Sequence, residues 1–499
     1  MGERRSAAGQ ASRRAVLKGA GGLAMALGTL GLAGERSTLP ERLTAFTVGR
    51  LPDIQFGISA FIGKARTFND GAGDVLAQLP PVHTVFTTAT LNRTPSVADK
   101  WMLGSALAEI ENAYPFAPHG VLTFVSYGIS YFDRLPVRLV AAHMPRLLSD
   151  TGRTALEEAV PSPTDVSSQN PGITKQTFNI PVQIEQNDIL FTFRSDNAAH
   201  ISDVLSWLGG SNSLRGRPVW SPTLFDGLAT VTSSRAHFTQ IGLPAQVAST
   251  AGLPYAKVIN RDSPMWMGFL DQQVDGSGPA SICTFAGNAS ARLTTARPGD
   301  YFDNGSVQHL SHVIEDLAQF YAGPSGTKKG ETYLERVQYM FRSNPAPSAG
   351  NTDQFSDGGG PAFLDNTFQG TGDAAANAQG VGTLDGKKRM GHLCGLQRSS
   401  RAADGTAMHI RMDGPGFDSM DVPGGANEPK LQFTIFVPTA EFFRTMRVNQ
   451  ASLDLVSQNG VKAVANGIER FITTTRRQNF LAPPRRHRSF PLLELAAGD

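Results

Sequence analysis

The chain has 499 residues, with 45 Lys and Arg against 43 Asp and Glu, so its formal charge of +2 is close to balance. Because no basic block dominates, nucleic acid is excluded as the default partner. Hydrophobic residues make up 40 % of the chain and charged residues 18 %, which predicts a sizeable core. The length predicts two domains, since single cores stop growing near ~250–300 residues.

The N-terminus carries a pattern typical of protein export. Residues 12–18 read S-R-R-A-V-L-K, and a weakly apolar, Gly- and Ala-rich stretch follows over residues 19–33. This is similar to a twin-arginine export signal and is too short for a transmembrane helix. We therefore expect residues 1–45 to be a signal peptide and disordered N-terminus, with a basic disordered tail as the alternative. The partner during export would be the twin-arginine translocase, and the destination the cell envelope, the periplasm or the medium.

From residue 46 onward, short apolar runs alternate with longer amphipathic ones. The runs rich in β-branched and aromatic residues predict strands at residues 121–127, 188–194, 307–314 and 431–437. Helices are predicted after Asp196-Asn197, over residues 315–321 and from Ala440 onward. This alternation predicts antiparallel strands with helices packed on one face, an α+β class. No later stretch reaches ~18 apolar residues, so we expect no transmembrane segment in the mature chain.

Changes in composition divide the chain further. We predict an N-terminal domain over residues 46–240, a C-terminal domain over residues 241–485 and a tail over residues 486–499. Residues 343–386 are crowded with Gly, Asn, Asp, Ser and Ala, which predicts a loop insertion or disordered linker inside the second domain. The basic run at residues 485–488 is most simply a solvated tail.

Several common site patterns are absent or weak. The chain has no GxSxG elbow, no HExxH pair, no Walker loop and no GxGxxG after a strand. Two cysteines, Cys283 and Cys394, exclude a four-Cys zinc site and leave either one disulfide or two separate thiols. His309 and His312 suggest a metal site with Glu315, but a spacing of three in a strand points them to opposite faces. Polar or exposed strand histidines are the simpler interpretation.

Three segments of the second half carry the chemistry. They are residues 262–272 (D-S-P-M-W-M-G-F-L-D-Q), 387–392 (K-K-R-M-G-H) and 409–417 (H-I-R-M-D-G-P-G-F). Together they resemble the dye-decolourising (DyP-type) haem peroxidase superfamily, in which a G-x-x-D-G motif precedes a proximal His and then a distal Arg. The resemblance extends loosely over residues 50–485. It implies two ferredoxin-like α+β domains, as in dimeric α+β barrels, with haem b in the second.

The resemblance implies a role for each matching residue. Asp271 is the distal acid–base residue, His392 ligates the iron, and Arg411 is the distal arginine beside the haem. Arg398 is a candidate contact for a haem propionate. Trp266 is either a relay for substrates too large for the pocket or, more simply, a buried packing residue.

The sequence also departs from the superfamily pattern. Gln272 stands where Gly usually closes the first motif, and Gly is used there for its backbone freedom. Cys394 replaces an Arg that contacts a propionate, and Asp413 stands where some relatives have Asn. His409 is a rival ligand, because His409-Ile410-Arg411 copies the H-I-R string that often begins at the ligand in this superfamily. No Arg follows His409 at the expected spacing, so we prefer His392.

The residue types suit peroxide chemistry. Neutral imidazole is the usual proximal haem ligand, a carboxylate can move a proton, and a guanidinium stabilises developing negative charge. We therefore predict an exported haem peroxidase, an oxidoreductase that reduces hydrogen peroxide and oxidises an organic reductant. The alternatives are a haem-binding protein of the same fold with little or no peroxidase activity, and a non-enzymatic binding module with an empty haem site. The sequence is compatible with a monomer and with a homo-oligomer.

Overall fold

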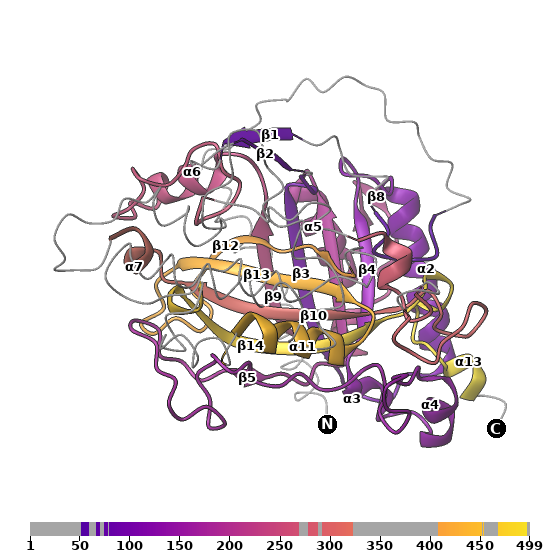
Figure 1. Ribbon diagram of the computed structural model, residues 1–499. Helices are drawn as coiled ribbons and strands as arrows, with labels where there is room; N and C mark the ends of the chain where they lie inside the picture. Colours follow the sequence, from indigo (N-terminus) through magenta and orange to yellow (C-terminus); the bar gives the residue numbers. More distant parts are fainter. Residues whose placement is uncertain are drawn as a thin grey trace, which may run out of the picture.

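The computed structural model describes residues 51–58, 66–69, 74–77, 79–268, 278–287, 292–322, 408–451, 453 and 468–496. Within these ranges, helices pack against a ten-stranded sheet, which confirms the predicted α+β class (Figure 1). The strands follow the order β11-β13-β10-β14-β4-β6-β3-β9, with β12 beside β13 and β5 beside β14. The predicted signal segment (1–45) and insertion (343–386) lie outside the described residues.

The bounds of the elements are as follows. The strands of the large sheet are β3 (His83–Leu91), β4 (Leu122–Tyr127), β5 (Gln183–Ile184), β6 (Ile189–Ser195), β9 (Ala229–Phe238), β10 (Ser306–Glu315), β11 (Ile410–Arg411), β12 (Gly414–Asp418), β13 (Glu428–Val437) and β14 (Ile472–Ala482). Two short hairpins pair β1 (Arg66–Asn69) with β2 (Asp74–Ala77) and β7 (Ser213–Leu214) with β8 (Arg217–Pro218). The α-helices are α2 (Val97–Ala113), α3 (Ile129–Phe132), α4 (Val137–His143), α5 (Ala198–Leu208), α6 (Leu243–Thr250), α7 (Leu317–Ala322), α11 (Ala440–Ala451) and α13 (Leu493–Ala496).

The strand order divides the large sheet into two ferredoxin-like units. In the first, β3, α2, β4, β6, α5 and β9 follow one another along the chain, and the strands lie in the order β9-β3-β6-β4. In the second, β10, α7, β12, β13, α11 and β14 follow one another, and the strands lie in the order β14-β10-β13-β12. Both are β-α-β-β-α-β arrangements of the ferredoxin type, as predicted. The units join where Leu481 of β14 pairs with Tyr127 of β4.

The predicted strands and helices are confirmed where local pattern determines them. β4, β6, β10 and β13 coincide with the four predicted strands to within a few residues. Asn197 caps α5, because its side chain accepts a hydrogen bond of 3.0 Å from the backbone N–H of Ala199. The apolar residues of α5 recur every three or four positions, so one face of the helix is buried on the sheet.

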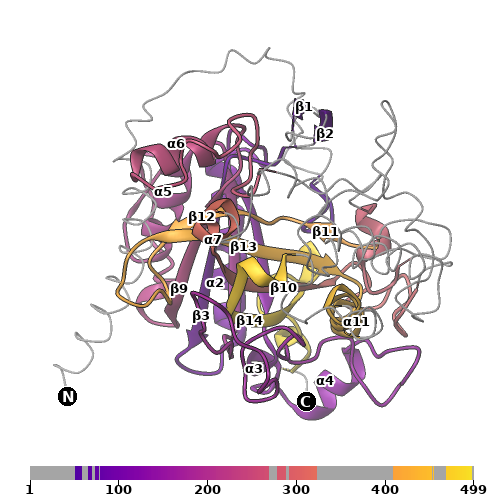
Figure 2. The same ribbon diagram turned by 60° about the vertical axis from the view of Figure 1, so that its left-hand side comes forward.

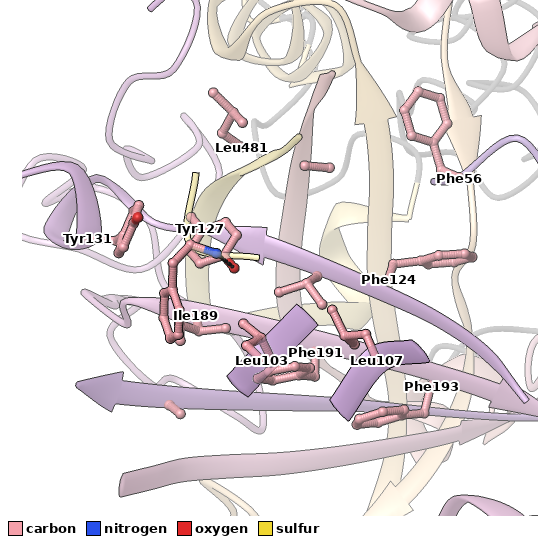
Figure 3. Close-up of a cluster of buried hydrophobic side chains, with 14 of the residues drawn as sticks. Phe56, Leu103, Leu107, Phe124, Tyr127, Tyr131, Ile189, Phe191, Phe193 and Leu481 are labelled. Carbon is pink, nitrogen blue, oxygen red and sulfur yellow. Dashed lines mark hydrogen bonds between the residues drawn. The ribbon is translucent and has the colours of Figure 1, made fainter. Parts of the chain in front are cut away.

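The core of the first unit lies between its sheet and α2. Leu103 and Leu107 of α2 lie beside Phe191 and Phe193 of β6, as Figure 3 shows. The rings of Phe191 and Phe193 lie on the same side of β6, with their centroids 5.9 Å apart. Since alternate strand residues share a face, the neighbours of these rings, Thr192 and Arg194, point to the opposite side of the sheet, toward the second unit.

The space between the two units is partly polar. Ser126 donates a 2.6 Å hydrogen bond to Gln308 Oε1, and Gln308 Nε2 donates to Thr192 Oγ1 at 3.1 Å. A small apolar cluster lies beside these bonds and comprises Phe86, Leu190, Leu310 and Phe480. At the far edge the sheet curls back, so that β12 approaches β9: a Cβ on Gly416 would lie 2.8 Å from Ala236 O (Figure 2).

The basic run at residues 485–488 is not a solvated tail, and that prediction is wrong. Arg485 and Arg488 both bind the carboxylate of Glu111 on α2, at 2.6 Å and 2.5 Å. Arg486 pairs with Asp53 and Asp303. Each arginine has an acidic partner far away in sequence, so the run ties the end of the chain to both units. No helix within the described ranges is long and apolar enough to cross a membrane.

Candidate active site

Arg411 lies on β11, on the face of the second unit that α11 covers. It pairs with Ile435 of β13, which in turn pairs with His309 of β10. Paired residues of an antiparallel sheet point to the same face, so these three side chains form one row. His309 stacks on Phe443 of α11, with ring centroids 3.9 Å apart, which identifies the face. Two strand spacings of about 5 Å separate Arg411 from His309, with apolar Ile435 between them.

A second row runs parallel to the first and contains Asp413. The backbone N–H of Met412 donates a 3.0 Å hydrogen bond to Thr434 O, and Gly414 pairs with Gln432. Asp413 therefore lies opposite Phe433, on the same face as Arg411, while Met412 points to the other face. In this row Phe433 pairs with Ser311 of β10. The site is thus an apolar strip with an arginine and a carboxylate at one edge.

The charges of Arg411 and Asp413 depend on each other. Burial lowers the pKa of Arg411, and the nearby Asp413 carboxylate opposes that shift. Burial raises the pKa of Asp413, and the positive charges of Arg411 and Arg194 oppose that shift. Both residues nevertheless remain half-buried and keep some accessible surface. Strong desolvation together with residual access is expected of side chains that line an internal binding site.

His309 lies at the other edge of the strip and is held in a fixed orientation. Its Nδ1 lies 2.7 Å from Asn479 Oδ1, and its Nε2 lies 2.6 Å from Ser311 Oγ. Burial lowers the pKa of His309 well below 6.5, and the charge of Arg477 adds to that effect, so the imidazole stays neutral. His309 is a site residue whose role the sequence pattern missed, because a strand histidine alone does not indicate what packs on it.

A buried ion pair supports this edge of the site. Arg477 of β14 donates to Ser311 Oγ at 3.0 Å and makes two bonds to Asp165, at 2.7 Å and 3.0 Å. Burial would raise the pKa of Asp165, but the Arg477 guanidinium outweighs it, so the pKa lies below 3.8. The sequence analysis did not predict the ion pair of Arg477 and Asp165. The one available signal was the pair of adjacent arginines, Arg476 and Arg477, which follows a run of three threonines.

The other predicted site residues lie outside the described ranges. These are Asp271, His392 and Arg398, together with Gln272 and Cys394. The structure therefore describes one of the predicted site residues, Arg411. The rival ligand His409 is described and buried, and its backbone oxygen accepts a 2.9 Å hydrogen bond from the N–H of Gly278.

The segment leading to Asp271 begins next to β12. Trp266 is fully buried, as the packing interpretation predicts, and its Nε1 donates a 2.9 Å hydrogen bond to Gly416 O. Gly268, the first residue of the predicted motif, adopts a left-handed conformation with φ of 83°. The described start of the motif is thus anchored to the strand that follows Asp413.

His309 and His312 do not form a metal site. They point to opposite faces of β10, as the strand spacing predicts, and both are buried rather than exposed. His312 Nδ1 lies 3.0 Å from Gln432 Oε1, on the side that faces the first unit. No group of three His, Cys, Asp or Glu side chains in the described part of the chain is arranged to hold a metal ion. Cys283 is a buried thiol, and Cys394 lies outside the described residues.

The chain is similar to proteins of known structure. No curated protein matches the chain. The encapsulated DyP-type peroxidase of Mycobacterium smegmatis is 14 % identical, with 84 % of this chain and 96 % of that chain covered and a TM-score of 0.45. A DypB variant of Rhodococcus jostii RHA1, solved in complex with haem, is 12 % identical, covers 82 % and 94 %, and has a TM-score of 0.44. A family of unknown function (DUF7405) matches residues 81–484, and the chain belongs to that family.

Proposed function

We propose that the chain is a haem b peroxidase that reduces hydrogen peroxide at the expense of an organic reductant. The observation that supports this most is the position of Arg411. The sequence resemblance requires a distal arginine in this segment. The described strand carries it on the helix-covered face of the second unit, half-buried beside a carboxylate and an apolar strip.

Two described features support a haem group at this site. Phe433 is a half-buried aromatic side chain opposite Asp413, and the half-buried Arg411 adds a positive charge on the same face. His392 would ligate the iron, and Arg398 would contact a propionate. When bound, haem supplies an iron with an open coordination position at which peroxide is reduced.

The chain's own groups would handle charge and protons. Arg411 carries a guanidinium group, which keeps its proton at any working pH. Its guanidinium can therefore stabilise negative charge on the departing peroxide oxygen. A carboxylate is needed to take a proton from one peroxide oxygen and return it to the other, and Asp271 is the residue that the resemblance assigns.

Export by the twin-arginine pathway is part of the proposal. It rests on residues 12–18 and on the Gly- and Ala-rich stretch after them. A pathway that carries folded proteins suits an enzyme that acquires its cofactor before export. The site of action would then be the cell envelope, the periplasm or the medium.

The test is the absorption spectrum of the full-length chain made in a haem-replete bacterial host. Wild type would be compared with His392→Ala and with His409→Ala as the matched rival. A Soret band that is lost only in His392→Ala supports haem binding and its ligand, and peroxide-dependent oxidation of a dye then supports the enzyme. A coloured but inactive protein favours the haem-binding alternative, and a colourless protein after haem reconstitution overturns the proposal.

A further inference from the structure

Asp413 is held in position from the opposite face of its strand. His237 of β9 is buried, and its Nε2 lies 3.0 Å from the backbone oxygen of Met412. A carbonyl oxygen only accepts, so Nε2 carries the proton and donates. On the other side of Asp413, Gly414 packs directly on the same imidazole. A Cβ there would lie 2.8 Å from His237 Cε1 and closer still to Nδ1.

The two contacts form a clamp on the peptide units around Asp413. Met412 is buried on the side that faces the first unit, so the segment cannot rotate without exposing an apolar side chain. Burial lowers the pKa of His237 to about 3, with the charge of Arg194 adding to the shift, so the imidazole stays neutral at working pH. A rigid backbone of this kind is what a precisely placed functional side chain requires.

The charges around Asp413 come from three elements. Arg411 precedes it on the same segment, Arg194 of β6 acts on it through its positive charge, and Glu315 lies at the end of β10. Arg194 is 1 % exposed, and its Nε donates to Thr84 Oγ1 at 3.0 Å. Its Nη2 is buried and makes no hydrogen bond within the described residues. Burial raises the pKa of Glu315 to about 8, with Asp413 adding to the shift, so Glu315 is largely neutral at pH 7.

We propose that Asp413 is an acid–base residue of the peroxide site, acting beside Arg411 and positioned by His237. This rests on the proposed function. The Asp413 carboxylate accepts the proton from one oxygen of hydrogen peroxide and returns it to the other oxygen, which leaves as water when the O–O bond breaks. The oxygen atom that remains becomes a second water by taking up two electrons and two protons, which two one-electron oxidations of the organic reductant supply. Asp413 ends the cycle as a carboxylate.

The carboxyl group of Asp413 can exist with or without its proton, whereas a side-chain amide at this position would neither gain nor lose a proton near neutral pH. The pKa of Asp413 is raised by burial, which brings a carboxyl group closer to the range in which acid–base catalysis at neutral pH is efficient. Arg411 is two residues away on the same face, so one peroxide molecule could contact both groups.

The experiment compares Asp413→Asn with Asp413→Glu and Asp271→Asn in the full-length, haem-loaded chain. The matched control is Asp133→Asn, since Asp133 is an exposed aspartate of the first unit. We expect Asp413→Asn to keep wild-type haem content and to lower peroxide turnover about 10²–10⁴-fold. It should also remove the acid limb of the pH–rate profile, which Asp413→Glu should restore in part. In the haem-free protein, the infrared band of the protonated Asp413 carboxyl should titrate in wild type and be missing in Asp413→Asn.

The outcomes separate this inference from the proposed function. If wild type is coloured and active and Asp413→Asn matches it, the role of Asp413 is wrong while the peroxidase stands. The same conclusion follows if only Asp271→Asn loses activity, or if the acid limb is unchanged in Asp413→Asn. If wild type binds no haem, the proposed function fails, and this inference fails with it.

Discussion

Replacing Gly414 by Ala tests the clamp on the candidate site directly. The new methyl group would lie 2.7 Å from Thr239 Oγ1 and 2.8 Å from His237 Cε1, both well inside van der Waals contact. These atoms belong to buried side chains, so neither can move into solvent. Overpacking of this kind costs about 1–3 kcal/mol. If the imidazole swings away, the Met412 carbonyl loses its partner, which adds about 1–3 kcal/mol.

The expected total is therefore about 2–6 kcal/mol of unfolding free energy, and urea denaturation of the full-length chain measures it. Gly172→Ala is the matched control, because Gly172 is exposed and a Cβ there meets nothing within 4 Å. A surface change of that kind should alter stability by no more than about 1 kcal/mol.

A double-mutant cycle with His237→Ala makes the test specific. Removing the imidazole opens the space into which the Ala methyl would project, so Gly414→Ala should cost clearly less in that background. Equal stability of Gly414→Ala and Gly172→Ala would refute the packing argument. An unchanged penalty in the His237→Ala background would show that the imidazole is not what the methyl meets.

Three further changes probe the export signal, the buried ion pair and the distal arginine. Replacing Arg13 and Arg14 together by Lys should leave the chain in the cytoplasm, as cell fractionation would show. Arg477→Met should cost about 3–5 kcal/mol at neutral pH, because it leaves the Asp165 carboxylate buried without its partner. With Arg477 present, the pKa of Asp165 lies below 3.8. The ion pair therefore stabilises the fold above pH 3.8, and this stabilisation is lost as the pH falls through the lowered pKa. The stability cost of Arg477→Met should shrink over the same acidic range in denaturation curves. Arg411→Leu should lower peroxide turnover by about 10²–10³-fold at unchanged Soret absorbance.

Matched variants identify what each result means. Arg4→Lys with Arg5→Lys should leave export normal, and cytoplasmic retention of that variant would remove the argument for the twin-arginine pattern. Arg153→Met breaks a half-exposed pair with Glu157 and should cost about 0–1 kcal/mol, so a similar loss for Arg477→Met would contradict its structural role. Arg444→Leu changes an exposed arginine and should keep full turnover. Retained activity in Arg411→Leu would exclude that residue from the reaction.

The sequence predicted those parts of the fold that depend on neighbours in the chain. The β-branched and aromatic run of β4, and the cap and apolar spacing of α5, are local patterns, and the structure confirms both. The order of strands within each ferredoxin-like unit came from the family resemblance, because local pattern does not determine which strands pair.

Contacts between distant residues could not be read from the sequence. Asp165 and Arg477 are 312 positions apart, and only the fold shows that they meet in the core. The basic run near residue 485 looked like a solvated tail because its partner, Glu111, lies more than 370 positions earlier. Of the candidate site, the sequence identified Arg411 through its motif. It gave no signal for the neutral His309 at the other edge of the strip.

The attachment of the chain's last residues to the first unit has a consequence for how the protein folds during synthesis. Tyr127 at the end of β4 donates a hydrogen bond to Arg488 O and accepts one from the N–H of Phe490, both at 2.7 Å. Tyr131 donates to Pro491 O at the same distance. These partners are synthesised about 360 residues after the tyrosines that they contact. The first unit therefore stays incompletely packed until synthesis is nearly finished, and Tyr127 and Tyr131 report on the final folding step.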